Sequence, residues 1–169
     1  MVKTSNKENN IRIIGGKWRS RKIVFQDYSE LRPTPDRVRE TLFNWLAPYI
    51  VNANCLDLFS GSGILSFESL SRGASKVVAI EQQKKIADYI KKNMDLFDVT
   101  FKYLNIIESD ALYWLDNFTA VPFDLVFLDP PFRKGLLQEV VDLLDGHAMI
   151  QDEALIYIER EKEMASLAV

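Results

Sequence analysis

The residues Asp129-Pro130-Pro131-Phe132 stand directly after an apolar stretch of the chain. Two consecutive prolines fix the backbone and end a strand, so they hold the Asp129 carboxylate and the Pro130 carbonyl in a rigid turn. Each of these oxygens can accept one N–H group of an exocyclic amine, which directs the nitrogen lone pair outward. Phe132 can stack on a flat base. We predict a catalytic corner that presents an amine; an ordinary surface turn is the alternative.

A glycine loop forms the second candidate site. Gly61 and Gly63 lie two residues apart, which lets the backbone turn tightly and approach a ligand closely. Glu81 follows Gly61 by 20 residues, and a carboxylate there can accept both hydroxyl groups of a ribose. A plain turn between a strand and a helix is the alternative. The candidate cofactor residues of this part of the chain are Asp57, Phe59, Ser60, Gly61, Ser62, Gly63 and Glu81.

The loop does not complete the dinucleotide pattern G-x-G-x-x-G, because Ser66 stands at the third glycine position. Asp57 is also poorly placed beside a pyrophosphate, so an NAD-dependent oxidoreductase is disfavoured. Asp57 suits a ligand with an amino group and a positive charge, and S-adenosylmethionine has both, together with a ribose. Asp110 can accept the amino group of the adenine or cap the N-terminus of a following helix, and both interpretations stay open.

These residues follow strands of an alternating pattern. We expect apolar strands at 55–59, 76–81, 104–108, 123–128 and 154–159, and helices at 64–72, 83–97, 111–118 and 136–144. Buried strands that alternate with helices predict a doubly wound, mostly parallel, Rossmann-like α/β sheet. Ligands bind such sheets at the carboxyl ends of the strands, which is where the candidate residues lie.

The chain is long enough for one compact domain, with three expected parts. Residues 1–10 read as a flexible polar tail. Residues 11–50 read as a basic arm, formed by a hairpin of 11–14 and 22–25, and a helix from Asp36 to near Pro48. Residues 51–169 read as the catalytic core.

The net charge of −3 hides an uneven distribution. Residues 1–50 hold ten Lys and Arg against five Asp and Glu, whereas the remainder holds 11 against 19. Such a split indicates a basic arm that meets nucleic acid or an anionic surface; a solvated charged surface is the alternative. Trp18 can stack on a base or pack beneath the arm. The candidate RNA-binding residues are Arg12, Lys17, Trp18, Arg19, Arg21, Lys22, Arg32 and Arg37.

Composition excludes several classes of protein. The chain is 47% hydrophobic but has no apolar run near the ~18 residues of a membrane helix. Its polar start lacks an export signal, and the lone Cys55 cannot form an internal disulfide. We therefore expect a cytoplasmic protein. Because no cluster of His and Cys occurs, we expect no metal.

Residues 12–22 and 31–46, taken with the two candidate sites, resemble the RsmD family, which methylates the exocyclic amine of a guanine in bacterial small-subunit (16S) ribosomal RNA. The resemblance runs from about Ile11 to Glu159. It implies a class I methyltransferase fold, S-adenosylmethionine as methyl donor, and ribosomal RNA, within an assembling small subunit, as partner. It also implies that 57–63, Glu81 and Asp110 bind the cofactor, that 129–132 hold the guanine, and that Arg32, Thr34 and Arg37 line the entrance, with Thr34 grouped with the cofactor residues.

One departure from the family concerns the end of the chain. The family continues past the fifth strand with a helix and an antiparallel strand pair, whereas only residues 160–169 follow Glu159 here. We expect that pair to be missing and the fifth strand to form a bare sheet edge, so that the protein is a monomer unless the edge pairs. A DNA adenine or cytosine amino-methyltransferase and a nonenzymatic RNA-binding protein remain as alternative functions.

Overall fold

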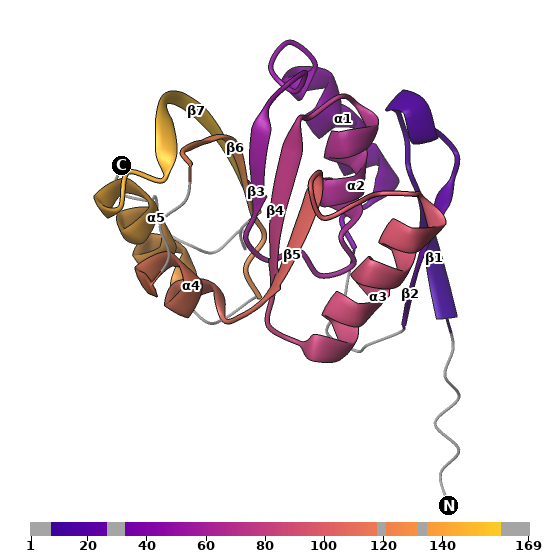
Figure 1. Ribbon diagram of the computed structural model, residues 1–169. Coiled ribbons are helices and arrows are strands. Elements are labelled where there is room, and N and C mark those ends of the chain that lie inside the picture. Colours follow the sequence, from indigo (N-terminus) through magenta and orange to yellow (C-terminus); the bar gives the residue numbers. More distant parts are fainter. Residues whose placement is uncertain (1–7, 27–32, 118–120, 132–134, 160–169) are drawn as a thin grey trace, which may run out of the picture.

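The computed structural model describes residues 8–26, 33–117, 121–131 and 135–159. Its centre is a five-stranded parallel sheet with the strand order β5-β4-β3-β6-β7 (Figure 1). The strands are β3 (Asn54–Asp57), β4 (Lys76–Glu81), β5 (Leu104–Glu108), β6 (Phe123–Leu128) and β7 (Ile150–Ile158). The predicted doubly wound α/β class is therefore confirmed.

Helices cover both faces of the sheet. One face packs against α1 (Asp36–Leu46), α2 (Ile64–Ser71) and α3 (Lys84–Leu96), and the other against α4 (Ala111–Asn117) and α5 (Leu136–Gly146). Because side chains alternate along a strand, Cys55 joins the first apolar cluster and Leu56 the second. The continuous apolar runs that predicted these strands thus come from strands buried on both faces.

A two-stranded antiparallel sheet precedes this core and forms the basic arm. It consists of β1 (Glu8–Arg12) and β2 (Lys22–Gln26), joined through the short 3-10 helix η1 (Gly16–Trp18). Glu8 pairs with Gln26, so β1 begins inside the stretch that the sequence assigned to a flexible tail. Apolar periodicity misses this part of the strand because its residues are polar and their pairing partners come from β2.

Strand β7 begins at Ile150, four residues before the predicted start. Phe123 pairs with Ile150 but Leu125 pairs with Leu155, so the register shifts between the two pairs. Gln151, Asp152 and Glu153 lie within this irregularity and are polar and exposed, which conceals them from a search for apolar strands. Within the described residues β7 lies at one edge of the sheet, the position expected for the fifth strand. No helix among the described residues is long and apolar enough to cross a membrane.

Candidate active site

Carboxylates stand at the carboxyl ends of β3, β4, β6 and β7. Asp57 ends β3, Glu81 ends β4, Asp129 follows β6 and Glu159 follows β7. Strands β3 and β6 are neighbours, but the chain leaves β3 through α2 on one face and β6 through α5 on the other. This divergence is the switch point at which open α/β sheets bind ligands. Asp57 and Asp129 therefore flank the place where a ligand is expected.

Asp57 is almost completely buried, with 2% of its surface exposed. Its pKa is raised to about 7, mainly by burial. The hydrogen bond that Ser66 Oγ donates to Asp57 Oδ2, at 2.6 Å, opposes the rise, and the Glu81 carboxylate contributes to it. A neighbouring cation stabilises the ionised form of such a buried carboxylate. Ser66, the residue that breaks the dinucleotide pattern, is thus a partner of Asp57, a role that the loop spacing alone did not indicate.

The glycine loop follows β3 and is hydrogen-bonded to the end of β4. Glu81 accepts the backbone N–H of Gly61 at 3.0 Å and that of Gln83 at 2.7 Å. Burial raises the pKa of Glu81, and these backbone hydrogen bonds lower it. Gly63 starts α2 with a φ of +77°, a conformation that favours glycine. Each Glu81 oxygen keeps a second lone pair, so the carboxylate can still accept the hydroxyl groups of a ribose.

The proline corner lies on the other side of the switch point. Asp129 and Pro130 are half-buried and Pro131 is exposed, whereas Phe132 lies outside the described residues. The pKa of Asp129 is raised to about 7, mainly by burial and to a smaller extent by the neighbouring carboxylates Glu159 and Asp57. A carboxyl group with this pKa can hold or release a proton near neutral pH.

Glu159 is a site residue that the sequence did not single out. Its Oε1 accepts a hydrogen bond from Thr34 Oγ1 at 2.8 Å and another from the Tyr157 hydroxyl at 3.0 Å. The available signal was its position, because a carboxylate directly after a strand of this sheet lies at the ligand edge. Thr34 is 4% exposed and lies beside Glu159 through this hydrogen bond, whereas its contact with the cofactor stays a prediction. Arg32 lies outside the described residues.

Comparison with known proteins places this arrangement in a family. The family described as Conserved hypothetical protein 95 matches residues 11–168. A protein of Escherichia coli (strain K12), named Ribosomal RNA small subunit methyltransferase D, is 50% identical over 155 residues, which are 90% of this chain and 76% of the relative. The protein of that name from Haemophilus influenzae is 44% identical over 163 residues, 96% and 84% of the two chains. The chain belongs to the RsmD family.

Solved structures agree with this assignment. A methyltransferase structure from Escherichia coli superposes with a TM-score of 0.84 at 46% identity and covers 95% of this chain and 86% of its own. A methylase structure from Haemophilus influenzae gives 0.80 at 42% identity, with 94% and 86% covered. The predicted RsmD family and the predicted enzyme class, a methyltransferase, are confirmed.

Asp110 occupies a different place in this RsmD-family chain from the carboxylates at the switch point. It is exposed, and its Oδ1 accepts the backbone N–H of Tyr113 at 3.0 Å. The structure therefore shows the capping interaction at the start of α4 that the sequence left open. A contact of Asp110 with the cofactor stays a prediction.

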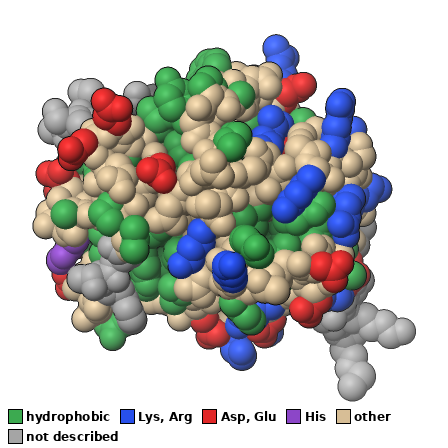
Figure 2. All heavy atoms as spheres, turned by 45° about the horizontal axis from the view of Figure 1, so that its top comes forward, with side chains coloured by type: hydrophobic (Ala, Val, Ile, Leu, Met, Phe, Trp, Pro, Cys, Tyr) green, Lys and Arg blue, Asp and Glu red, His purple; other side chains and the backbone are tan. Residues whose placement is uncertain are grey.

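All six basic side chains among the described RNA-binding candidates are exposed, and two of them also make contacts within the protein. Figure 2 shows Lys and Arg side chains on the side of the molecule that carries the arm, and several Asp and Glu side chains toward β7. Arg12 pairs with Asp36, and Arg21 donates to the Leu96 carbonyl at 2.6 Å. The exposed basic side chains among the predicted RNA-binding residues are Arg12, Lys17, Arg19, Arg21, Lys22 and Arg37.

Trp18 does not face solvent. Its ring packs edge-on against Phe97, with 5.2 Å between the ring centres, and against Phe67 at 6.3 Å. It is 9% exposed, so it is not available to stack on a base. Its prediction as an RNA-binding residue is wrong in this structure, and the packing role explains its position: an indole this large, close to two phenyl rings, contributes more as core.

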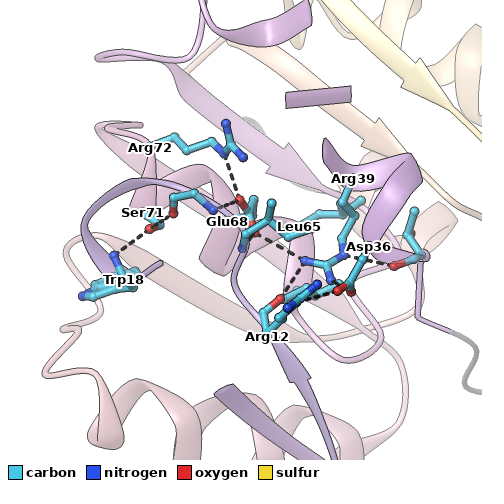
Figure 3. Close-up of polar contacts among 12 residues, drawn as sticks. Arg12, Trp18, Asp36, Arg39, Leu65, Glu68, Ser71 and Arg72 are labelled. Carbon is cyan, nitrogen blue, oxygen red and sulfur yellow. Dashed lines mark hydrogen bonds and ion pairs between the residues drawn. The ribbon is translucent and has the colours of Figure 1, made fainter. Parts of the chain in front are cut away.

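A buried ion network joins the arm to α2 (Figure 3). Glu68 is fully buried and accepts the backbone N–H groups of Ile14 and Gly15, each at 2.8 Å. It also contacts Arg39 at 3.4 Å and Arg72 at 2.8 Å. Helix α2 starts at the glycine loop, so this carboxylate fixes the arm to the same element that carries the cofactor loop.

Proposed function

We propose that this protein transfers a methyl group from S-adenosylmethionine to the exocyclic N2 amine of a guanine in small-subunit ribosomal RNA, within an assembling subunit. The observation that carries the proposal is the pair of carboxylates at the switch point, Asp57 and Asp129, whose pKa values burial raises to about 7. Asp57 suits a cation, and Asp129 suits an exocyclic amine. The names of the Escherichia coli and Haemophilus influenzae relatives support ribosomal RNA over DNA as the substrate.

The residues around β3 and β4 fit S-adenosylmethionine by the chemistry of their donors and acceptors. Asp57 would hold the amino group, and its negative charge stabilises a cation in a buried place. Glu81 would accept the ribose hydroxyl groups, and the loop at Gly61 and Gly63 allows close backbone approach. When bound, S-adenosylmethionine supplies a methyl group on a positively charged sulfur that leaves as a neutral thioether.

The proline corner would prepare the amine. The nitrogen of an exocyclic amine is a poor nucleophile because its lone pair is delocalised into the ring. Asp129 and the Pro130 carbonyl each accept one N–H, which directs the lone pair toward the methyl group. Asp129 can also take the proton that the nitrogen loses, because its pKa of about 7 allows it to hold a proton at neutral pH. Holding both reactants together supplies much of the rate enhancement.

Methyl transfer from labelled S-adenosylmethionine tests the proposal. The substrates are small subunits that lack the modification, naked ribosomal RNA and duplex DNA, with the modified base identified by mass spectrometry. We expect N2-methylguanine in RNA, more from subunits than from naked RNA. Label in adenine or cytosine of DNA would contradict the proposal.

Two Asp→Asn variants, each of which removes one negative charge, test whether Asp129 takes part in the reaction. Asp129→Asn should lower kcat by at least about 100-fold, the order that a positioned acid or base contributes, while cofactor affinity by calorimetry stays within severalfold. Asp152→Asn, on the exposed part of β7, should behave as the wild type. Wild-type turnover in Asp129→Asn would remove this carboxylate from the mechanism.

A further inference from the structure

Glu159 stands beside Asp129 at the ligand edge of the sheet. The backbone N–H of Glu159 donates to the carbonyl of Leu128 at 2.8 Å, and Leu128 pairs with Ile158 in the parallel register. Glu159 and Asp129 are therefore the next residues along two neighbouring strands. Burial is the main cause of the raised pKa of Asp129, and the Glu159 charge is the second, as expected for close carboxylates.

Both hydrogen bonds to the Glu159 side chain end on the same oxygen. Thr34 Oγ1 and the Tyr157 hydroxyl donate to Oε1, at 2.8 and 3.0 Å. Tyr157 in turn packs against Phe127 of β6, with 6.4 Å between the ring centres. The described residues provide no hydrogen-bond donor for Oε2. Within the described part of the chain, the Glu159 side chain is thus held by two donors on Oε1 and Oε2 has no donor, so Oε2 can accept from a ligand.

The chemistry of the bases tells which ligand suits a second acceptor beside Asp129. In guanine, N1, one of the two ring nitrogens beside the N2 amine, carries a hydrogen, so N1 and N2 form a pair of neighbouring donors. In adenine and cytosine the ring nitrogen next to the exocyclic amine carries a lone pair and no hydrogen. A carboxylate accepts from a donor and repels a lone pair.

We infer that Glu159 Oε2 accepts the N1–H of the target guanine and that Glu159 is therefore the residue that selects guanine over adenine and cytosine. The inference rests on the proposed function, because it assumes that Asp129 holds the N2 amine. Thr34 and Tyr157 are positioning residues, since they act by orienting the Glu159 carboxylate. A flipped base is read by such contacts to its Watson–Crick edge.

Ribosomal RNA with 2-aminopurine at the target position tests the inference. This base keeps the 2-amino group, but its N1 has no hydrogen. For the wild type we expect kcat/KM on the 2-aminopurine RNA to be lower than on the guanine RNA by roughly 10- to 150-fold, the value of a hydrogen bond to a charged group. In Glu159→Gln the ratio should shrink by about 10-fold or more, because the amide can donate to the unprotonated N1.

The comparison of the two RNAs cancels other effects of the substitution. The absence of O6 in 2-aminopurine changes the ratio of the two kcat/KM values equally in the wild type and in the variant. A change in the pKa of Asp129 acts on both RNAs within one enzyme and so leaves that ratio unaltered. Glu153→Gln is the matched control, because it removes the same charge from an exposed position of β7 and should keep the wild-type ratio. Thr34→Val removes one donor to Glu159 and should lower kcat/KM on guanine without raising it on 2-aminopurine.

The outcomes separate the inference from the function on which it rests. If the wild type does not methylate the guanine RNA, the proposed function fails. If it methylates both RNAs with equal kcat/KM, or if Glu159→Gln keeps the wild-type ratio while binding S-adenosylmethionine normally, Glu159 does not read N1 and the inference is overturned. The first comparison uses only the wild type, so equal values on the two RNAs overturn the inference even if the variant does not fold.

Discussion

Replacement of Glu68 tests how the arm is held on the core. The Glu68 side chain is completely buried and accepts from the backbone of Ile14 and Gly15 as well as from Arg39 and Arg72 (Figure 3). The Glu68→Ala change removes the acceptor of all four groups at once. It leaves the Arg39 side chain, also fully buried, with a reduced set of partners, among them Asp36. The change therefore acts on both the arm and α1.

The expected cost follows from these contacts. Removing one partner of a buried ion pair costs about 3–5 kcal/mol, whereas the N–H groups of Ile14 and Gly15 are only part-buried, so water can replace their lost acceptor. We expect the free energy of unfolding to fall by about 3–5 kcal/mol, a large share of the roughly 5–15 kcal/mol of a typical domain. The melting temperature should fall by roughly 6–20 °C. Glu68→Gln keeps the shape and one accepting oxygen and should still cost about 2 kcal/mol.

Urea unfolding and amide hydrogen exchange measure the two consequences. The unfolding midpoint should fall in both variants, and the amides of Ile14 and Gly15 should lose their protection. Glu139→Gln, at an exposed position of α5, is the control and should change stability by less than about 0.5 kcal/mol. If both Glu68 variants cost less than about 1 kcal/mol and the two amides stay protected, apolar packing of Ile13 and Trp18 holds the arm instead.

Three further predictions concern the site and the arm. Burial raises the pKa of Asp57 to about 7, so between about pH 4 and pH 7 the native state holds a proton that the unfolded state has released. The free energy of unfolding therefore falls as the pH rises through this range, by at most about 4 kcal/mol for this group. Urea unfolding at pH 5 and pH 8 should show a smaller fall in Asp57→Asn than in the wild type, and an equal fall would contradict the role of burial. Gly63→Ala places a side chain at a φ of +77° and 3.2 Å from Ile90, which should cost roughly 1–2 kcal/mol and weaken cofactor binding in calorimetry; unchanged stability and affinity would show that the loop tolerates a Cβ. Replacing the exposed Lys17, Arg19 and Lys22 by Ala should weaken the salt dependence of RNA binding. The slope of log K against log salt concentration should fall by about 0.7 for each phosphate that the arm no longer neutralises. Lys102→Ala is the control, and an unchanged slope would exclude the arm from RNA binding.

Much of the fold can be predicted from local patterns in the sequence. Each strand of the sheet has an apolar run that the local sequence pattern reveals, although β7 also has a polar first part that the pattern misses. The helices show an apolar face, except α2, which is buried on all sides. The strand-end rule then identifies Asp57, Glu81 and Asp129, because a parallel sheet brings the carboxyl ends of its strands to one edge. The sequence by itself therefore determines the fold class, the family and most of the carboxylates of the site.

Tertiary structure alone decided the partners of those residues. Thr34 and Glu159 are 125 residues apart in the chain, yet they form a hydrogen bond beside Asp129. Local periodicity carries no trace of this contact, because it depends on how the segment before α1 packs over the end of β7. The same reason accounts for Trp18, whose side chain is amphipathic enough for either a surface or a core. Only the packing of the arm on α2 and α3 puts its ring against Phe67 and Phe97 and removes it from the surface.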